Sequence, residues 1–261
     1  MTKLMGVVNV TPDSFSDGGL YFDPEAAVAH GRELAAAGAE ILDVGGESTR
    51  PGAEAVPEDE ELRRVIPVIR GSAAAGTRIS VDTSKAAVAA AALDAGAEIV
   101  NDITALRGDQ EMARLCAERQ ATVVLMHMRG EPRTMQDDPR YGDVVAEVKA
   151  FLAGRLEAAV AAGIAEERVW LDPGIGFGKT AAHNMELLRR LGELRELGRP
   201  LVIGTSRKSF IGKVDGSAAG ERLGGTIASS VLAAAEGAEV LRVHDVAEVR
   251  QALAVATAIL G

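Results

Sequence analysis

The sequence is poor in cysteine and in aromatic residues. Among its 261 residues there is one cysteine, Cys116, so no disulfide can form within the chain. Cys116 falls in the apolar stripe of an expected helix, which predicts a buried and unreactive thiol. Aromatic residues make up only 3% of the chain. The core must therefore be built from Val, Leu, Ile and Ala, which suits parallel strands buried on both faces.

The chain also lacks long apolar runs and an excess of basic residues. No apolar run approaches the ~20 residues of a membrane-spanning helix, and the N-terminus lacks the long apolar region of a signal peptide. The formal net charge is −10, whereas a nucleic-acid-binding protein usually carries a basic face. We therefore expect a cytoplasmic protein that binds neither nucleic acid nor membranes. A local cationic pocket for a small anion is compatible with this charge.

What the chain does have is a regular alternation of short apolar runs and amphipathic stretches. Eight runs have the length and composition of buried strands, and they lie at residues 5–10, 40–44, 78–81, 98–101, 122–126, 169–172, 201–204 and 240–243. Helical patterns follow at residues 23–37, 58–75, 84–95, 110–119, 141–162, 182–195, 222–235 and 246–260. Eight such units predict an α/β fold, a single-domain (β/α)8 TIM barrel over residues 1–261. A doubly wound open sheet is the alternative, and it needs fewer strands or a further domain.

Polar side chains follow the apolar runs at the expected strand ends. They are Asn9, Asp43, Asp82, Asn101, Asp102, His127, Asp172, Lys208, Arg242 and His244. In a closed parallel barrel these ends converge on one face, where barrel enzymes build their sites. Helix capping would account for one or two such residues, so polar residues at all eight ends indicate a site. His127 could simply line the barrel rim.

Three of these residues suit a flat heterocycle. Asp82, Asn101 and Asp172 offer acceptors for adjacent N–H groups, as in an amino-pyrimidinone, and the amide also donates. Each also has a plainer interpretation. Either aspartate could cap the helix that follows it, and Asn101 could satisfy backbone groups of a loop.

Three further residues suit an anion, and a fourth suits a metal ion bound with it. Lys208, Arg242 and His244 are donors or cations that fit a phosphorylated group. Asn9 could add a neutral ligand to a hard metal ion bound with a diphosphate. In isolation, Lys208 could be a solvated surface charge and His244 a polar loop residue. Together the residues predict an oxyanion pocket beside the base-like pocket.

Two early loops and one glycine-rich segment have unusual sequences. Residues 11–20 (TPDSFSDGGL) and 45–56 (GGESTRPGAEAV) form loops longer than usual, typical of mobile lids or of tolerated insertions. Residues 173–180 (PGIGFGKT) resemble a phosphate-binding P-loop. However, Pro173 stands where that motif requires glycine, and the segment follows the sixth strand rather than the first.

The sequence resembles the dihydropteroate synthases in a series of ordered motifs. The two longest are MGVVNVTPDSFSDGG at residues 5–19 and LDVGGESTRPG at residues 42–52. Shorter ones are SVDT at 80–83, VNDI at 100–103, DPGIGFGK at 172–179, SRKS at 206–209 and RVHD at 242–245. They cover essentially the whole chain, and no functional position of the family is lost.

The resemblance implies a (β/α)8-barrel enzyme of folate biosynthesis, usually a homodimer. Its small-molecule substrates would be a pterin methyl diphosphate and p-aminobenzoate, with Mg²⁺ as cofactor. Diphosphate would depart before the amine attacks, while Mg²⁺ and cationic side chains stabilise the leaving group. No protein nucleophile or dedicated general base is needed, because an arylamine is nucleophilic while neutral.

The resemblance also implies roles for individual residues. The pterin ring would be held by Asp82, Asn101, Asp172 and Lys208. The diphosphate would face Arg242 and His244, with Thr49 and Arg50 nearby and Asn9 as a ligand of Mg²⁺. The p-aminobenzoate would lie near Ser209, Phe15 and Pro51. The residues expected to be catalytic, by binding and orienting the substrates, are Arg50, Lys208, Arg242 and His244.

Two other functions share this barrel and its pterin pocket. One is a pterin-dependent methyltransferase domain, and the other is a non-catalytic pterin-binding paralogue. The intact TPDSFSDGG and GESTRPG loops favour the synthase, because they would serve the diphosphate and the second substrate.

Overall fold

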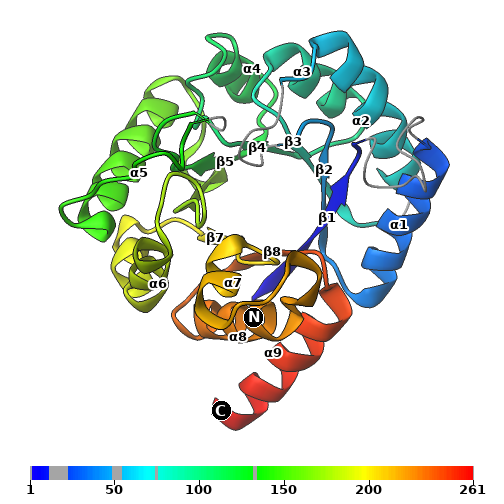
Figure 1. The fold of residues 1–261 in the computed structure, drawn as a ribbon. Helices are drawn as coiled ribbons and strands as arrows, with labels where there is room; N and C mark the ends of the chain where they lie inside the picture. Colours follow the sequence, from blue (N-terminus) through cyan, green and yellow to red (C-terminus); the bar gives the residue numbers. More distant parts are fainter. Residues whose placement is uncertain (1, 12–22, 49–54, 74–75, 132–133, 261) are drawn as a thin grey trace.

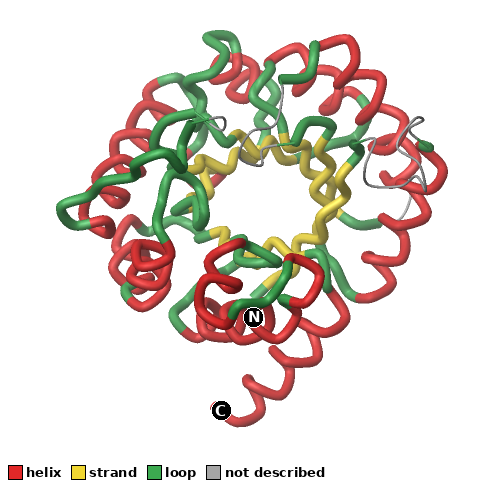
Figure 2. The backbone as a smooth tube through the Cα atoms, in the orientation of Figure 1, coloured by secondary structure: helices red, strands yellow, loops and turns green. Residues whose placement is uncertain are grey.

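The strands form a ring of parallel neighbours, and the helices lie outside that ring (Figures 1 and 2). The computed structural model describes residues 2–11, 23–48, 55–73, 76–131 and 134–260. The strands are β1 (Lys3–Asn9), β2 (Ile41–Gly45), β3 (Arg78–Asp82), β4 (Ile99–Asp102), β5 (Thr122–Met126), β6 (Val169–Asp172), β7 (Val202–Ile203) and β8 (Val240–Val243). Each expected strand is therefore present, with its ends within two residues of the prediction.

The sheet closes on itself. Its strand order is β6-β5-β4-β3-β2-β1-β8-β7, and a parallel bridge between Leu171 and Leu201 joins the two ends of this series. The backbone N–H of Leu171 also donates to the carbonyl of Pro200 at 2.9 Å. The predicted barrel is therefore confirmed, and the open doubly wound sheet is wrong.

The α-helices largely follow the predicted segments. They are α1 (Pro24–Ala37), α2 (Glu58–Ala73), α3 (Ala86–Asp94), α4 (Met112–Glu118), α5 (Val144–Ala161), α6 (Ala181–Arg189), α7 (Ser209–Asp215), α8 (Leu223–Ala235) and α9 (Val246–Leu260). Helix α7 is missing from the helical patterns found in the sequence, because its two turns are shorter than the window of about 11 residues that periodicity needs. The helix expected at 182–195 is α6 followed by the 3-10 helix Leu191–Leu197.

Local signals explain how the first helix begins and ends. The side chain of Asp23 caps α1 by accepting from the backbone N–H of Glu25 at 2.9 Å. After α1 the chain turns at Gly38 with φ of 109°, a conformation that glycine adopts without a Cβ penalty. In α4, Cys116 is fully buried, which confirms its predicted burial, and burial raises the pKa of its thiol to about 12. Within the described ranges, no helix is long and apolar enough to cross a membrane.

The interior of the barrel is apolar in its middle and polar toward the C-terminal ends of the strands. One buried cluster, distinct from the core between sheet and helices, takes residues from seven strands: Met5, Ile41, Ile99, Val124, Trp170, Val202 and Val240. Side chains along a strand alternate between its two faces, so residues two positions further on also face the interior. Those positions include Asp43, Asn101, Asp172 and Arg242. The fold thus places a layer of polar side chains, called the polar layer below, inside the barrel on the C-terminal side of an apolar filling.

Candidate active site

Arg242 lies at the centre of the polar layer and contacts two carboxylates. Its Nε donates to Oδ2 of Asp43 at 2.6 Å, and its Nη2 donates to Oδ2 of Asp82 at 2.8 Å. The amide Nδ2 of Asn101 donates to the same oxygen of Asp43 at 3.2 Å. One residue of β8 therefore links β2 and β3 within the barrel, and Asn101 adds β4 to the network.

This network carries charge that is largely shielded from water. Asp43 is 0% exposed, and its Oδ1 has no hydrogen-bond partner among the described residues. Burial raises the pKa of Asp82 to about 7, an effect that Arg242 opposes and Asp43 reinforces. Burial disfavours the charge of Arg242, but Asp43 and Asp82 hold its pKa above the usual value. The layer therefore keeps a permanent cation beside a carboxyl group that titrates near neutral pH.

Asp172 and Lys208 form the other half of the polar layer. Asp172 is buried at the end of β6 and accepts from the backbone N–H of Gly174 at 2.6 Å. Lys208 Nζ donates to the carbonyl of Ile175 and lies 4.7 Å from the ring centroid of Phe177. Burial lowers the pKa of Lys208 to about 8 against the influence of Asp172, and burial raises the pKa of Asp172 against that of Lys208. The two side chains thus lie close enough to influence each other electrostatically, each favouring the charged form of the other.

Helix capping does not explain the two aspartates. Helix α3 has Lys85 as its N-cap residue, and α6 is capped by the Thr180 hydroxyl, so neither Asp82 nor Asp172 caps the helix that follows it. Asn101 donates to Asp43, whereas the next residue, Asp102, holds the loop after β4 through the backbone N–H of Thr104 and Leu106. The capping interpretation of Asp82 and Asp172 is therefore wrong.

The remaining described candidates lie around the rim. Asn9 is the half-buried last residue of β1 and pairs in register with Gly45. His244 follows β8, and its Nδ1 lies 3.0 Å from the Ser206 hydroxyl. Ser209 is the exposed first residue of α7. Phe15, Thr49, Arg50 and Pro51 lie outside the described residues, so their roles stay predictions.

The second early loop starts from a charged cluster that the sequence did not reveal. Lys85 donates to Glu47, in the first part of this loop, and to the buried Glu61 of α2 at 2.5 Å. Arg64 of α2 donates to the carbonyl of Gly46 at 2.8 Å. Several side chains thus fix the chain just before residues 49–54.

Asp43 and His127 also differ from the sequence-based expectation. Asp43 was recognised as a strand-end residue but not as part of the site, although its position two residues after Ile41 was a usable signal. His127 does not line the rim. It is buried, and its Nδ1 lies 2.9 Å from Nζ of Lys179.

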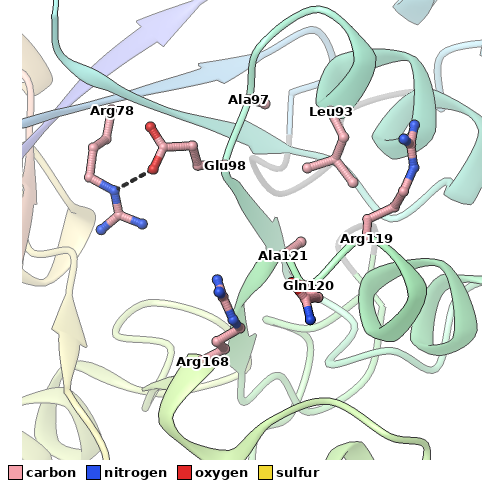
Figure 3. Close-up of a pocket in the computed structure, with 8 residues that line it drawn as sticks. All are labelled: Arg78, Leu93, Ala97, Glu98, Arg119, Gln120, Ala121 and Arg168. Carbon is pink, nitrogen blue, oxygen red and sulfur yellow. Dashed lines mark hydrogen bonds and ion pairs between the residues drawn. The ribbon is translucent and has the colours of Figure 1, made fainter.

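A separate pocket opens at the opposite end of the barrel, where the strands begin (Figure 3). Arg78 lines it from the start of β3 and Arg168 from the 3-10 helix Glu166–Arg168 before β6, and Arg78 donates to Glu98 at 3.0 Å. Arg119, also on the lining, pairs with Asp94. Barrel enzymes build their sites at the C-terminal ends of the strands, so we place the candidate site in the polar layer and not here.

The described residues offer few ligands for a metal ion. Among them, no group of three or more His, Cys, Asp or Glu side chains is arranged to hold one. The amide oxygen of Asn9 at the rim is a hard neutral ligand of the kind that Mg²⁺ accepts. Mg²⁺ usually keeps few protein ligands and takes others from substrate phosphates, so this donor set fits an ion bound together with a diphosphate.

The chain is similar to known proteins over nearly its whole length. Residues 5–244 match the family described as pterin binding enzyme. The dihydropteroate synthase of Escherichia coli strain K12 is 48% identical over 259 residues, which cover 99% of this chain and 92% of that protein. Dihydropteroate synthase of Xanthomonas albilineans, solved with 4-aminobenzoic acid, has a TM-score of 0.94 and 52% identity and covers 100% of this chain and 93% of its own. A structure from the same organism in complex with 7,8-dihydropteroate has a TM-score of 0.90 and 48% identity, with coverage of 100% and 94%.

Proposed function

The chain belongs to the dihydropteroate synthase family of pterin-binding enzymes, and from this premise we propose which residues carry each part of the reaction. The enzyme condenses 6-hydroxymethyl-7,8-dihydropterin diphosphate with p-aminobenzoate, which gives 7,8-dihydropteroate and diphosphate for folate biosynthesis. One observation carries the placement of this reaction, namely the buried polar layer above the apolar filling of the barrel.

The pterin ring binds to Asp82, Asn101, Asp172 and Lys208. A pterin has an edge of adjacent N–H groups, and the carboxylate of Asp172 is an acceptor that is already largely removed from water. A ligand without those N–H groups would leave buried acceptors unpaired, which costs affinity and gives the pocket its selectivity. Lys208 contributes a cation on the same side of the layer.

The diphosphate faces Arg242 and His244, together with Thr49 and Arg50 of the second loop. The guanidinium of Arg242 has five N–H groups, and only Nε and Nη2 donate to the two carboxylates. Asn9 supplies a ligand to Mg²⁺, which when bound neutralises charge on the departing diphosphate. Arg242 and Asn9 come from the adjacent strands β8 and β1, a placement that supports a shared oxyanion pocket.

In this reaction the protein mainly positions the two substrates, and no side chain acts as a nucleophile. The C–O bond to the diphosphate breaks with both electrons leaving on oxygen, and the pterin ring delocalises the positive charge on the methylene carbon. The neutral amine of p-aminobenzoate then attacks that carbon, forms the C–N bond and loses a proton to diphosphate or water. Ser209 lies near the carboxylate of p-aminobenzoate, and Phe15 and Pro51 help to close its pocket against water.

We also infer that the enzyme is a cytoplasmic homodimer that acts only on small molecules. Apolar side chains are exposed on the last two helices, with Leu232 of α8 at 63% and Ile259 of α9 at 77% exposure, which supports a dimer surface there. A single buried cysteine supports a reducing compartment, and the net charge of −10 disfavours nucleic acid. Sedimentation of the wild type and of Leu232→Asp tests the dimer, which this substitution should dissociate.

The first test of the proposed function is diphosphate release by the purified protein. The pterin diphosphate and Mg²⁺ are supplied with p-aminobenzoate or without it. We expect release that depends on p-aminobenzoate and is matched by formation of dihydropteroate. Pterin binding without release or product would instead identify a non-catalytic pterin-binding paralogue.

A further inference from the structure

Lys179 is a buried lysine to which the reaction assigns no role so far. It is 2% exposed and ends the glycine-rich segment that resembles a P-loop in sequence. Its Nζ lies 2.9 Å from His127 Nδ1, and it donates at 2.9 Å to each of the carbonyls of Gly174 and Phe177. The carbonyl of His127 is 3.3 Å away. Its Nζ therefore bonds to protein atoms instead of facing a phosphate, and burial lowers the pKa of this lysine well below the usual value.

The segment that Lys179 holds lies against the residues that follow β5. A Cβ atom at Gly174 would come within 1.9 Å of the carbonyl oxygen of His127, and one at Gly178 within 2.3 Å of that of Arg129. Both glycines also have positive φ values, 67° and 62°. Only glycine allows this approach, and it is at this contact that Lys179 bonds to both the segment and His127.

The same segment makes the contacts that shape the pterin pocket. Its Gly174 donates to Asp172, and its Ile175 carbonyl accepts from Lys208. The ring of its Phe177 lies over the ammonium group of Lys208. A shift of this segment would therefore displace two side chains of the pocket at once.

We propose that Lys179 is a positioning residue of the pterin pocket, which fixes the segment 173–179 against His127 and thereby aligns Lys208 and Asp172. The inference rests on the proposed function, because it assumes that this pocket holds the pterin. Burial lowers the pKa of His127 to about 3, so its ring is neutral and its Nδ1 can accept from Lys179. Lys179 acts through Lys208 and Asp172 and does not itself contact the substrate.

Lys179→Met tests the proposal, because methionine keeps the unbranched chain and removes the Nζ group with its hydrogen bonds. Lys149→Met is the matched control, since Lys149 forms a partly exposed ion pair with Glu196. In Lys179→Met we expect at least tenfold weaker binding of 6-hydroxymethyl-7,8-dihydropterin by calorimetry. The KM for p-aminobenzoate should stay within twofold of the wild-type value.

The pH profile separates positioning from general destabilisation. In Lys179→Met we expect the pH dependence of pterin binding to move to higher pH, because Lys208, whose pKa burial lowers to about 8, would become more exposed to water. A folded variant with unchanged pterin affinity, or one in which both substrates lose affinity equally, would overturn the proposal. Failure of the wild type to bind the pterin would instead refute the proposed function.

A second variant tests the positioning role of Lys179 if Lys179→Met does not fold. His127→Leu removes the ring acceptor but leaves the lysine and its bonds to the carbonyls of its own segment. We expect the same selective loss of pterin affinity, about threefold to tenfold, with the KM for p-aminobenzoate unchanged. Full pterin affinity in this variant would show that the bond between the two segments does not align the pocket.

Discussion

The two ends of the barrel use the same kinds of residue in opposite ways. At the N-terminal end, Arg78 pairs with Glu98, and their side chains are 35% and 56% exposed. At the C-terminal end, Arg242 pairs with Asp43 and Asp82, which are 0% and 11% exposed, and is itself 23% exposed. The first is a one-to-one surface pair, whereas the second is a half-buried cation shared between two largely buried acids.

The difference in burial determines what each arrangement does. An exposed ion pair contributes about 0–1 kcal/mol, because water screens its attraction. A buried pair loses several kcal/mol of hydration per ion, and an apolar replacement of the whole group is often as stable. The charges at the C-terminal end are therefore poorly explained by stability and well explained by binding of a polar, charged ligand.

The largest expected effect comes from removing the shared cation. Arg242→Met leaves Asp43 and Asp82 buried side by side without a counter-charge, which should lower the free energy of unfolding by about 3–5 kcal/mol. Urea denaturation measures this loss, and turnover should fall below detection. Adding Asp43→Asn to the variant should restore part of the stability. An unchanged unfolding midpoint in Arg242→Met would show that the charge network at the C-terminal end matters no more for stability than the exposed pair at the N-terminal end.

Loss of one acceptor should have the next largest effect, and it should act on binding rather than folding. Asp172→Ala leaves ring N–H groups of the bound pterin without an acceptor, which should cost about 2 kcal/mol, or roughly 30-fold in affinity. Calorimetry with the pterin measures it, and Glu98→Gln at the other end serves as the control. Equal affinity in wild type and Asp172→Ala would exclude this residue from the site.

The alternation of short apolar runs with helical patterns was the most informative signal in the sequence. It located all eight strands within two residues and placed Asp172 at the C-terminal end of the sixth. It could not pair Asp43 with Arg242, which lies 199 positions away, because that contact arises only when β8 closes against β1. Nor could it show whether a lysine faces solvent. Lys179, in a segment that resembles a phosphate loop, is buried.

The pH dependence of pterin binding should further distinguish the C-terminal end of the barrel from the N-terminal end. Its effect should be smaller than that of Asp172→Ala. Burial lowers the pKa of Lys208 to about 8, so its charged form predominates below pH 8 and is lost above it. If binding uses the ammonium group, affinity should fall by about fivefold between pH 8 and pH 9. Lys208→Arg should remain flat over this range, because arginine stays charged. If pterin affinity of the wild type were equally independent of pH, binding would not use the charge of Lys208.

The smallest effect is expected at the N-terminal end. Arg78→Met removes a bond to Glu98 at 3.0 Å and a contact in which the guanidinium lies 5.5 Å from the ring centroid of Trp170. Glu98 is exposed and can be hydrated once its partner is gone, so unfolding should lose only about 1 kcal/mol. The kcat/KM for both substrates should stay within twofold, because the apolar filling of the barrel separates this end from the polar layer. A large loss of activity in a stably folded Arg78→Met protein would mean that the two ends communicate through the filling, and the division into a structural end and a binding end would fail.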